Sequence, residues 1–420
     1  ADTLIVGRFL GANALAAVGS AFSLMTFLTS VILGLAMGSG TVFSIRFGQK
    51  DEQALKEGVL ASFVLLGAVT VVLNLLVFAG MDWIILALRT PAELMTMMRE
   101  YLRVIFAGLV GIFLYNFFAA LLRSLGNSTV PLAFLAVSAG LNILLDLWFV
   151  AGLGRGVAGA AEATVISQYV SGIGIAAYTW RRFPALFRRD PAVRLRAARL
   201  REITSFSALT CLQQSIMNLG ILAVQGLVNS FGTTIMAAFA AAVKIDAFAY
   251  LPVQDFGNAF SIFISQNYGA GRSDRIRRGI RSAVLCSVGF GCVLSAAVWL
   301  LAAPLMGLFI DAGETAVIAE GVRYLRIEGA FYALIGVLFL LYGLYRALGR
   351  PGMSVVLTVV SLGLRVALAY TLAPTVGVVG IWWAVPIGWV IADALGVGYY
   401  LARGKRLGRG EERQTEGRVP

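Results

Sequence analysis

Histidine is absent from the sequence, and charged residues make up only 13% of its 420 residues. A soluble chain of this length needs about a quarter charged residues to cover its surface. Without histidine the chain has neither the commonest metal ligand nor the usual proton shuttle near neutral pH, so carboxylates must carry any proton chemistry. The sequence also has no GxSxG motif and no DDxxD-like metal pair. These absences argue against an intramembrane enzyme.

Cysteine is also rare, with three residues, Cys211, Cys286 and Cys292. All three lie within apolar stretches and none has CxxC spacing. We therefore interpret them as packing residues and not as a redox or metal site.

Apolar residues, in contrast, are abundant and form long runs. They account for 59% of the chain, and a bilayer-spanning helix needs about 20 consecutive apolar residues. The residues up to about Arg8 read as the end of a first helix whose beginning is missing. Eleven further spans are predicted, at 14–45, 56–80, 94–123, 129–151, 157–180, 202–230, 235–266, 278–305, 317–346, 352–373 and 378–402.

The runs follow an internal duplication. Residues 11–62 align without a gap on residues 232–283, so that Gly11 falls on Gly232 and Gly58 on Gly279. After a slip of two residues, the segment LRSLGNSTVP falls on YRALGRPGMS. GVAGAAEATVISQ (156–168) then falls on GVVGIWWAVPIGW (377–389), back at the first offset. Duplicated membrane bundles are typical of transporters, which place a site between repeats.

Basic residues predict the orientation and explain the net charge of +12. One set of connections contains 25 Lys and Arg, and the opposite set contains seven. The positive-inside rule places the richer set, the C-terminus and the N-terminus of a complete first helix in the cytoplasm. The basic residues are thus bilayer anchors, and we expect no nucleic-acid partner.

The domain organisation follows from the duplication and from one long polar connection. We predict an N-terminal six-helix lobe at 1–180 with helix 1 incomplete, an Arg-rich cytoplasmic linker at 181–201, a C-terminal six-helix lobe at 202–402 and a disordered cytoplasmic tail at 403–420. The linker's arginines also suit anionic headgroups, although a simple tether near the membrane is the favoured interpretation.

Ionisable groups inside the predicted spans are candidate functional residues because their burial in lipid is costly. In the first lobe, Asp2 lies near the end of helix 1, and Asn142 and Asp146 share one face of helix 5. The second copy has Ala223, Arg365 and Ala369 at these positions. Two carboxylates with amide and hydroxyl neighbours suit sodium or a shared proton. The alternative is that Asp146 binds backbone groups freed at a kink.

The predicted second lobe contains charges of both signs within its spans: Lys244, Asp246, Asp255, Glu328 and Arg365. Arg365 lies near mid-helix and should meet a carboxylate, for which Asp246, Asp255 and Glu328 are the candidates. A structural ion pair and a substrate contact are equally compatible with this pattern. In the first lobe, Glu162 is predicted to lie at a water-accessible mouth, and its role stays open, as does that of Arg365.

Four segments carry a family resemblance: DTLIVGRFLGANALAAVG, LRSLGNSTVP, LNILLDLWFVAGLGRGVAGAAEATVISQ and SQNYGAGRSDRIRRG. They resemble the multidrug and toxic compound extrusion (MATE) transporters, and are most similar to the DinF-like bacterial branch. The resemblance implies an all-α integral membrane protein with twelve helices, the first of them truncated, in two homologous six-helix lobes that form a V around a central cavity. It further implies a monomer in the inner membrane, without a cofactor, that exports small organic cations or drugs in exchange for sodium or protons.

The resemblance also assigns residues to a cation or proton coupling site in the first lobe. Asp2 corresponds to the helix 1 aspartate, Asn142 and Asp146 to the helix 5 pair, and Thr164 to the helix 6 threonine; Asn116 corresponds to a helix 4 asparagine. If sodium is the coupling ion, Asp2 and Asp146 are its expected ligands.

One departure from the family and one alternative function are visible. The NorM-like branch carries a glutamate on helix 7, where this chain has Gln213 and Gln214, so that branch's site is not carried over. Both glutamines are grouped with the polar residues of the second lobe. The alternative is a flippase for a lipid-linked glycan, which would need a basic cavity. Lys244 and Arg365 favour it, whereas the neighbouring acids disfavour it.

Overall fold

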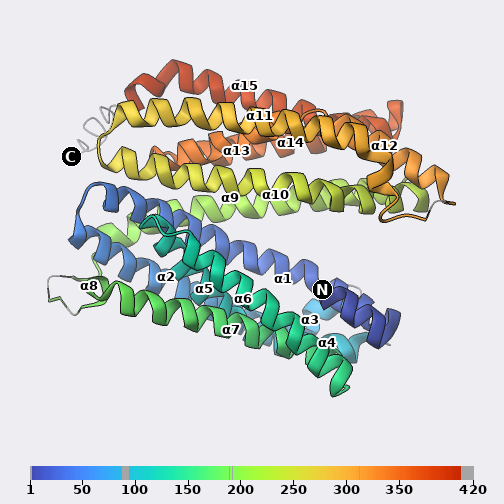
Figure 1. The fold of residues 1–420 in the computed structure, drawn as a ribbon, viewed down its shortest axis with the longest axis horizontal. Coiled ribbons are helices and arrows are strands. Elements are labelled where there is room, and N and C mark those ends of the chain that lie inside the picture. Colours follow the sequence, from blue (N-terminus) through green and yellow to red (C-terminus); the bar gives the residue numbers. More distant parts are fainter. Residues whose placement is uncertain (1, 88–93, 189, 192, 312, 408–420) are drawn as a thin grey trace. The chain divides into compact units, whose positions relative to one another are not determined.

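The computed structural model describes residues 2–87, 94–188, 190–191, 193–311 and 313–407, and every regular element in these ranges is helical. Two compact units divide the chain. One comprises Ala1–Phe47 and Asp51–Cys211, and the other comprises Gly48–Lys50 and Leu212–Pro420. The predicted all-α membrane fold in two lobes is confirmed (Figure 1). The V-shaped arrangement and the central cavity stay predictions.

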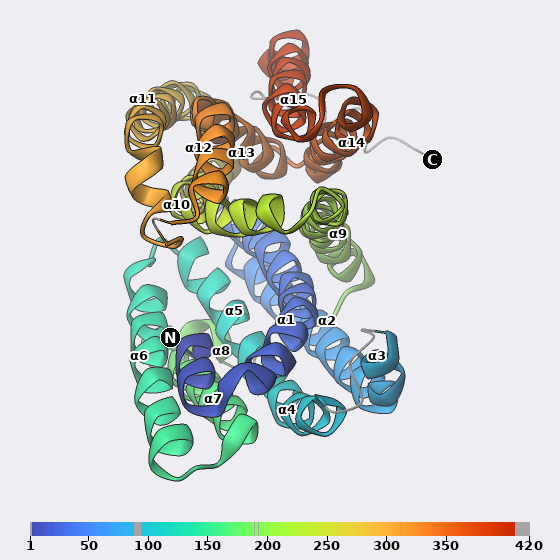
Figure 2. The same ribbon diagram turned by 90° about the vertical axis from the view of Figure 1, so that its right-hand side faces the viewer.

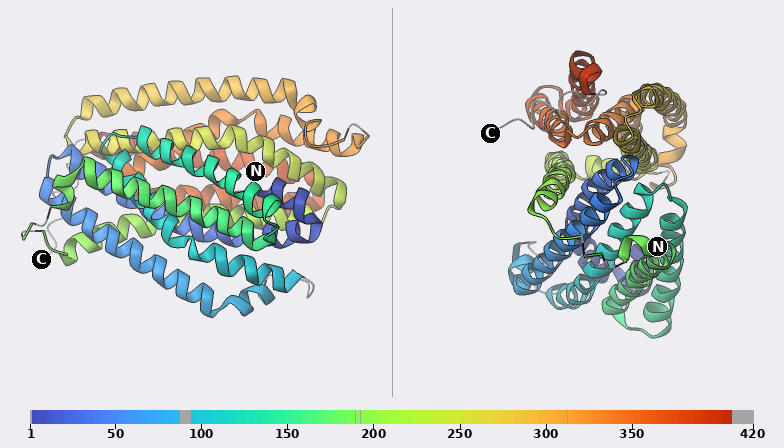
Figure 3. Two further views of the ribbon diagram at one scale, coloured as in Figure 1. Left: turned by 60° about the horizontal axis from the view of Figure 1, so that its bottom comes forward. Right: turned by 90° about the vertical axis from the view of Figure 1, so that its left-hand side faces the viewer.

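The first unit is built from α1 and the helices that follow it up to α8. Their bounds are α1 Asp2–Gly48, α2 Glu52–Ala79, α3 Met81–Ala87, α4 Met95–Ala107, α5 Leu109–Ser124, α6 Thr129–Asp146, the π-helical η2 Leu147–Gly152, α7 Gly156–Arg182 and α8 Pro184–Phe187. Within this unit α7 packs against α4, α5 and α6, and α6 and α7 lie side by side (Figure 3). Helix α9, Ala197–Asn229, begins in the first unit and ends in the second.

The second unit contains the last six helices, α10 Thr233–Gly269, α11 Ser273–Met306, α12 Thr315–Gly329, α13 Tyr332–Ala347, α14 Pro351–Val376 and α15 Val378–Leu407. Helix α13 packs against α10, α11, α14 and α15, and α14 pairs with α15 (Figure 2). The hydrophobic core of the second unit surrounds Trp382, which is stacked on Phe239 and edge-on to Tyr324.

Nine helices or continuous helix pairs in the described ranges are long and apolar enough to cross a membrane. A tenth span results if α12 and α13, bent by 51° relative to each other, count as one. Each of the eleven spans predicted from the apolar runs coincides with a helix or with such a pair. Helix α7 is 27 residues long and lies outside the group of nine.

Two predicted boundaries differ from the structure. First, α9 begins at Ala197 inside the predicted linker, since the segment AARLR consists of strong helix formers. Second, α15 continues to Leu407, beyond the predicted start of the tail at 403. Helix α1, in contrast, is kinked at Gly11, whose φ/ψ are non-helical, between the predicted end of helix 1 and the predicted start of the next span.

Positive φ angles recur at aligned positions of the two copies. Gly11 has φ +84° and ψ −175°, and its aligned partner Gly232 has φ +94° and ψ 173°. Lys50, the one non-glycine residue with positive φ in the described part of the chain, aligns with Gly271, which also has positive φ. Two more aligned pairs share positive φ, namely Gly126 with Gly349 and Gly156 with Gly377. Left-handed backbone is rare enough that four coincidences at the aligned offsets identify equivalent turns.

Glycines bring α1 unusually close to the first part of α9. A Cβ atom on Gly38 would lie 2.5 Å from the Cα of Ser207, and one on Gly34 would lie 2.6 Å from the Cα of Cys211. The Ser207 hydroxyl lies 3.0 Å from the Ser39 hydroxyl and donates to the Leu35 carbonyl. Small residues allow such backbone approach between helices in lipid.

Candidate functional site

Helix α6 points its apolar side chains outward and a carboxylate inward. Its buried residues are Pro131 and Asp146, whereas Leu132 and Leu144 are 65% and 66% exposed. Asp146 is completely buried at the last residue of α6, where the α-helix widens into η2. Such π-helical turns are frequent at functional sites. A buried carboxylate on a helix whose other side chains face outward is a costly arrangement that calls for a function.

A polar seam connects α6 to α7 beside this carboxylate. The Asn142 amide donates to the Thr164 hydroxyl at 3.2 Å, and the Ser138 hydroxyl donates to the Ser167 carbonyl at 2.9 Å. Ser138, Asn142 and Asp146 are spaced by four residues, so they share one face of α6. We call these three residues, with Thr164 and Ser167, the α6–α7 seam. Carbonyl, hydroxyl, amide and carboxylate oxygens are the ligands that hard cations prefer.

The other two residues assigned to coupling have different outcomes. Asn116, on α5, donates its amide to the carbonyl of Ile112 in its own helix. Among the described residues, no side-chain hydrogen bond joins Asn116 to the seam. The side chain of Asp2 lies outside the described residues, so the predicted pairing of Asp2 with Asp146 stays a prediction. Ser138 and Ser167 were missed from the sequence, although the four-residue spacing of Ser138, Asn142 and Asp146 could have revealed the first.

The second unit has its own buried polar cluster. The hydroxyls of Tyr324 and Tyr332 both donate to the carboxylate of Asp246. Glu328, one turn after Tyr324 on α12, is 6% exposed and interacts electrostatically with Asp246. Arg365, on α14, interacts electrostatically with both acids. We call these five residues the tyrosine–acid cluster.

A small cavity adjoins the cluster. Its volume is about 60 Å³, and Tyr250, Glu328 and Arg365 are among its lining residues. Drug-sized ligands occupy pockets of about 300 Å³ or more, and a water molecule takes about 30 Å³. In this conformation the cavity therefore accommodates water, not a drug.

The remaining polar residues predicted for this lobe lie apart from the cluster or make no side-chain hydrogen bond to it. Asp255 is exposed on α10, so it is not the buried partner expected for Arg365. Lys244 is also exposed and lies 6.0 Å from the centre of the Phe309 ring. Gln213 and Gln214 are buried on α9. Glu162, in the first unit, pairs with Arg155 at 2.8 Å, and both side chains are partly exposed.

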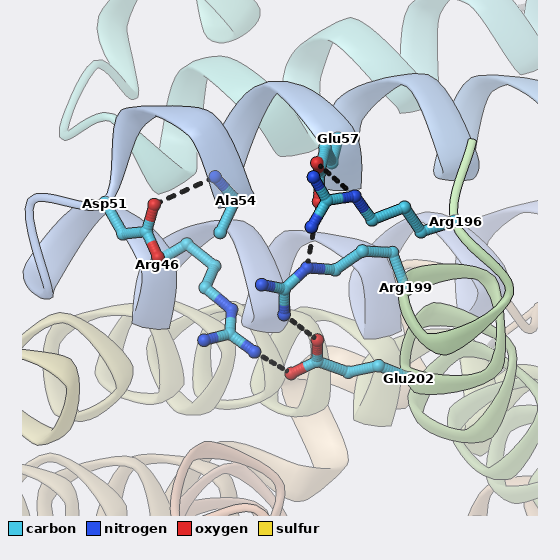
Figure 4. Close-up of polar contacts among 7 residues, drawn as sticks. All are labelled: Arg46, Asp51, Ala54, Glu57, Arg196, Arg199 and Glu202. Carbon is cyan, nitrogen blue, oxygen red and sulfur yellow. Dashed lines mark hydrogen bonds and ion pairs between the residues drawn. The ribbon is translucent and has the colours of Figure 1, made fainter. Parts of the chain in front are cut away.

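An ion-pair network ties α1 and α2 to the start of α9 and to Arg196 just before it, and its acids were missed from the sequence. Glu57, 1% exposed on α2, forms ion pairs with Arg196 at 3.1 Å and with Arg199 at 3.3 Å. Glu202 accepts from Arg199 at 3.0 Å and from Arg46 (Figure 4). The arginine-rich linker was the available signal in the sequence, because so many arginines close together call for acidic partners such as Glu57 and Glu202. The end of the linker is thus fixed to the first unit by Glu57 and Glu202.

Comparison with known proteins supplies the family. The chain is 29% identical over 360 residues to "Probable multidrug resistance protein YpnP" of Bacillus subtilis, covering 86% of this chain and 80% of that protein. It is 28% identical over 412 residues to "Probable multidrug resistance protein YoeA" of the same organism, covering 94% and 88%. A solved outward-facing multidrug resistance MATE transporter aligns with a TM-score of 0.90 at 23% identity, covering 97% of this chain and 91% of that one.

The description of the matching family model is MatE, and the model aligns with residues 1–148 and 210–371. Both lobes are therefore included in the match, as the duplication requires. The predicted resemblance to MATE transporters is confirmed, while the DinF-like branch stays a prediction. The chain belongs to the MatE family of membrane transporters.

Proposed function

We propose that the chain is a secondary active antiporter that exports organic cations or drugs in exchange for inward sodium or protons. The single observation that carries the proposal is Asp146, a fully buried carboxylate on a helix that otherwise faces outward. The relatives' names, probable multidrug resistance proteins, support the substrate class.

Coupling requires that the ion bind one conformation more tightly than the other. Asp146 lies where α6 gives way to η2, so a small change in that turn alters which oxygens surround the carboxylate. One helical turn before Asp146, the hydrogen bond from Asn142 to Thr164 orients the side-chain oxygens beside the carboxylate. Sodium or a proton entering from outside would neutralise Asp146 and favour the conformation that releases the drug.

The proposal includes the protein's setting. The chain works as a monomer in the bacterial inner membrane, with both termini in the cytoplasm, and needs no cofactor beyond the coupling ion. The excess of Lys and Arg in one set of connections supports this orientation.

The flippase alternative is disfavoured by the composition of the tyrosine–acid cluster. A pyrophosphate-binding cavity needs unpaired cations. Here Arg365 lies in the electrostatic field of two acids, Asp246 and Glu328, and the cavity beside it has a volume of only about 60 Å³.

The test uses everted vesicles that contain the protein and a fluorescent organic cation on the outside. Under the proposal the dye accumulates when either an outward-directed sodium gradient or an interior-acid pH gradient is imposed, and the gradient that drives it identifies the coupling ion. Protein-free vesicles set the background. Dye movement that ignores both gradients would refute antiport.

A further inference from the structure

A second and larger cavity lies in the first unit, away from the α6–α7 seam. Its volume is about 420 Å³, within the range of about 300–1,000 Å³ typical of ligand sites. The wall consists of side chains from α2, α5, the end of α7 and α8, together with residues up to Val193. None of the residues proposed for coupling lines it.

Aromatic rings form the interior of this cavity. Trp180 and Phe187 stack with centroids 5.2 Å apart and an interplanar angle of 7°, and Phe187 lies 6.3 Å from Phe118. Phe63 and Phe117 continue the aromatic wall at 5.2 Å from each other. An interior of this composition favours a hydrocarbon chain and cannot satisfy a free ion.

Charged side chains lie on the lining as well, and cations outnumber acids. Lys56 is on α2 and Arg188 follows α8, and one carboxylate, Asp190, accompanies them. Asp190 lies 4.0 Å from the Lys56 ammonium, at the limit of an ion pair. The surrounding segment 181–201 contains eight arginines and a single acid. The charged side chains that line the cavity, Lys56, Arg188 and Asp190, thus have a net positive charge.

The cavity lies near the ends of two helices. Lys56 lies in the second turn of α2, and Trp180 lies two residues before α7 ends at Arg182. Trp180 is 61% exposed. Tryptophan and basic residues at helix ends are typical of the boundary between acyl chains and headgroups.

We propose that this cavity binds an anionic phospholipid, with one acyl chain along the aromatic wall and the phosphate between Lys56 and Arg188. The phosphate competes with Asp190 for the Lys56 ammonium. The Asp190 carboxylate lies 4.0 Å from that ammonium, so the ion pair to be replaced is weak. The lipid holds α8 and the linker against the ends of α2 and α7. This role does not depend on the direction or substrate of transport.

Fluorescence quenching by brominated lipid tests the proposal, because Trp180 is part of the wall. The full-length protein is reconstituted in phosphatidylcholine vesicles with increasing fractions of brominated phosphatidylglycerol or brominated phosphatidylcholine. The chain has seven tryptophans, so the Trp180 signal is the difference between the parent protein and Trp180→Phe. We expect half-maximal quenching of that signal at an about fivefold lower fraction of the anionic lipid, the effect of one basic side chain at the membrane surface.

Charge variants of both signs make the test specific. Lys56→Gln and Arg188→Gln should each reduce the preference for the anionic lipid, whereas Asp190→Asn should increase it. A gain of preference is a result that misfolding does not produce. Arg278→Gln, which removes an exposed arginine of α11 remote in sequence from the cavity, is the matched control and should change nothing.

Several outcomes would overturn the proposal. Equal quenching by the two brominated lipids would reduce the cavity to ordinary lipid contact. Competition by soluble glycerol phosphate would show a phosphate site without an acyl chain. Displacement of the lipid by a hydrophobic cation at similar concentration would make the cavity a drug site.

Discussion

In the first copy of the repeat, Gly126 follows α5 with φ +88°, and the next N–H, of Asn127, donates to Leu122 at 2.9 Å. In the second copy Gly349 follows α13 with φ +81°, and the N–H of Arg350 donates to Tyr345 at 2.8 Å. Both turns are Schellman-type helix ends. The two copies thus share their turns down to single hydrogen bonds.

The buried acids of the two copies, in contrast, are not shared. Asp146 and Thr164 of the seam align with Ala369 and Val385. The acids of the tyrosine–acid cluster, Asp246 and Glu328, align with Met25 and Ile105. The turns and the buried charges are therefore under separate constraints. A turn depends only on its backbone conformation, whereas a charge buried in the membrane is costly and is kept where it has a function.

The largest expected effect separates Asp146 and Asp246 by function. Asp146→Asn should reduce gradient-driven dye transport to that of protein-free vesicles, because an amide cannot take up a proton or neutralise sodium. Asp246→Asn should keep the response to the gradient, because the coupling carboxylate is still present. Initial rates of dye accumulation in everted vesicles measure both.

The proposed division of function between Asp146 and Asp246 would be refuted if the two variants showed the same gradient-driven dye transport. Elution as a single species in detergent is the control for folding. Full transport by Asp146→Asn would remove that residue from coupling, and loss of the gradient response in Asp246→Asn would move coupling to the second copy.

The helices and the duplication could be predicted from the sequence because apolar run length and glycine spacing are local properties. Asn142 and Thr164 could be assigned to one site through the family resemblance, and Asp146 could be singled out because a carboxylate is costly to bury in lipid. The hydrogen bonds from Tyr324 and Tyr332 to Asp246 could not be predicted. They join three helices, and the rotation of each helix about its axis depends on packing that the sequence does not reveal. For the same reason Asp255, a sequence candidate for pairing with Arg365, is exposed in the structure.

Gly38→Ala should give the largest loss of stability, about 3 kcal/mol for overpacking. The added methyl would lie 2.5 Å from the Cα of Ser207, so α1 and α9 must separate. The second copy already has alanine at the aligned position, Ala259, so the variant makes the first copy resemble the second. Thermal unfolding in detergent measures the loss.

Gly40→Ala on the same helix is the matched control for this packing. Its methyl would meet Ala120 at 3.4 Å, an ordinary contact. Equal unfolding temperatures for the two variants would contradict the close approach of α1 and α9.

Tyr332→Phe should destabilise the second copy by about 2 kcal/mol, because it removes a donor from the partly buried Asp246 carboxylate. The first copy has Leu109 at this position and needs no such donor. The cost should fall by about half in an Asp246→Asn background, where the acceptor is neutral and charge assistance is lost. An unchanged cost would mean that the hydroxyl serves another acceptor.

Lys50→Gly should give the smallest effect, and in the opposite direction. Lys50 has φ +57°, while the aligned Gly271 adopts φ +66° without strain. Relief of about 1–2 kcal/mol of left-handed strain exceeds the about 0.5–1 kcal/mol of extra chain entropy, so the net gain is about 0.5 kcal/mol. Lys50→Ala keeps the strained conformation and should show no gain, which separates backbone relief from the loss of charge. Thermal unfolding of both variants measures the difference, and equal stability would mean that the two turns differ in strain despite their matching angles.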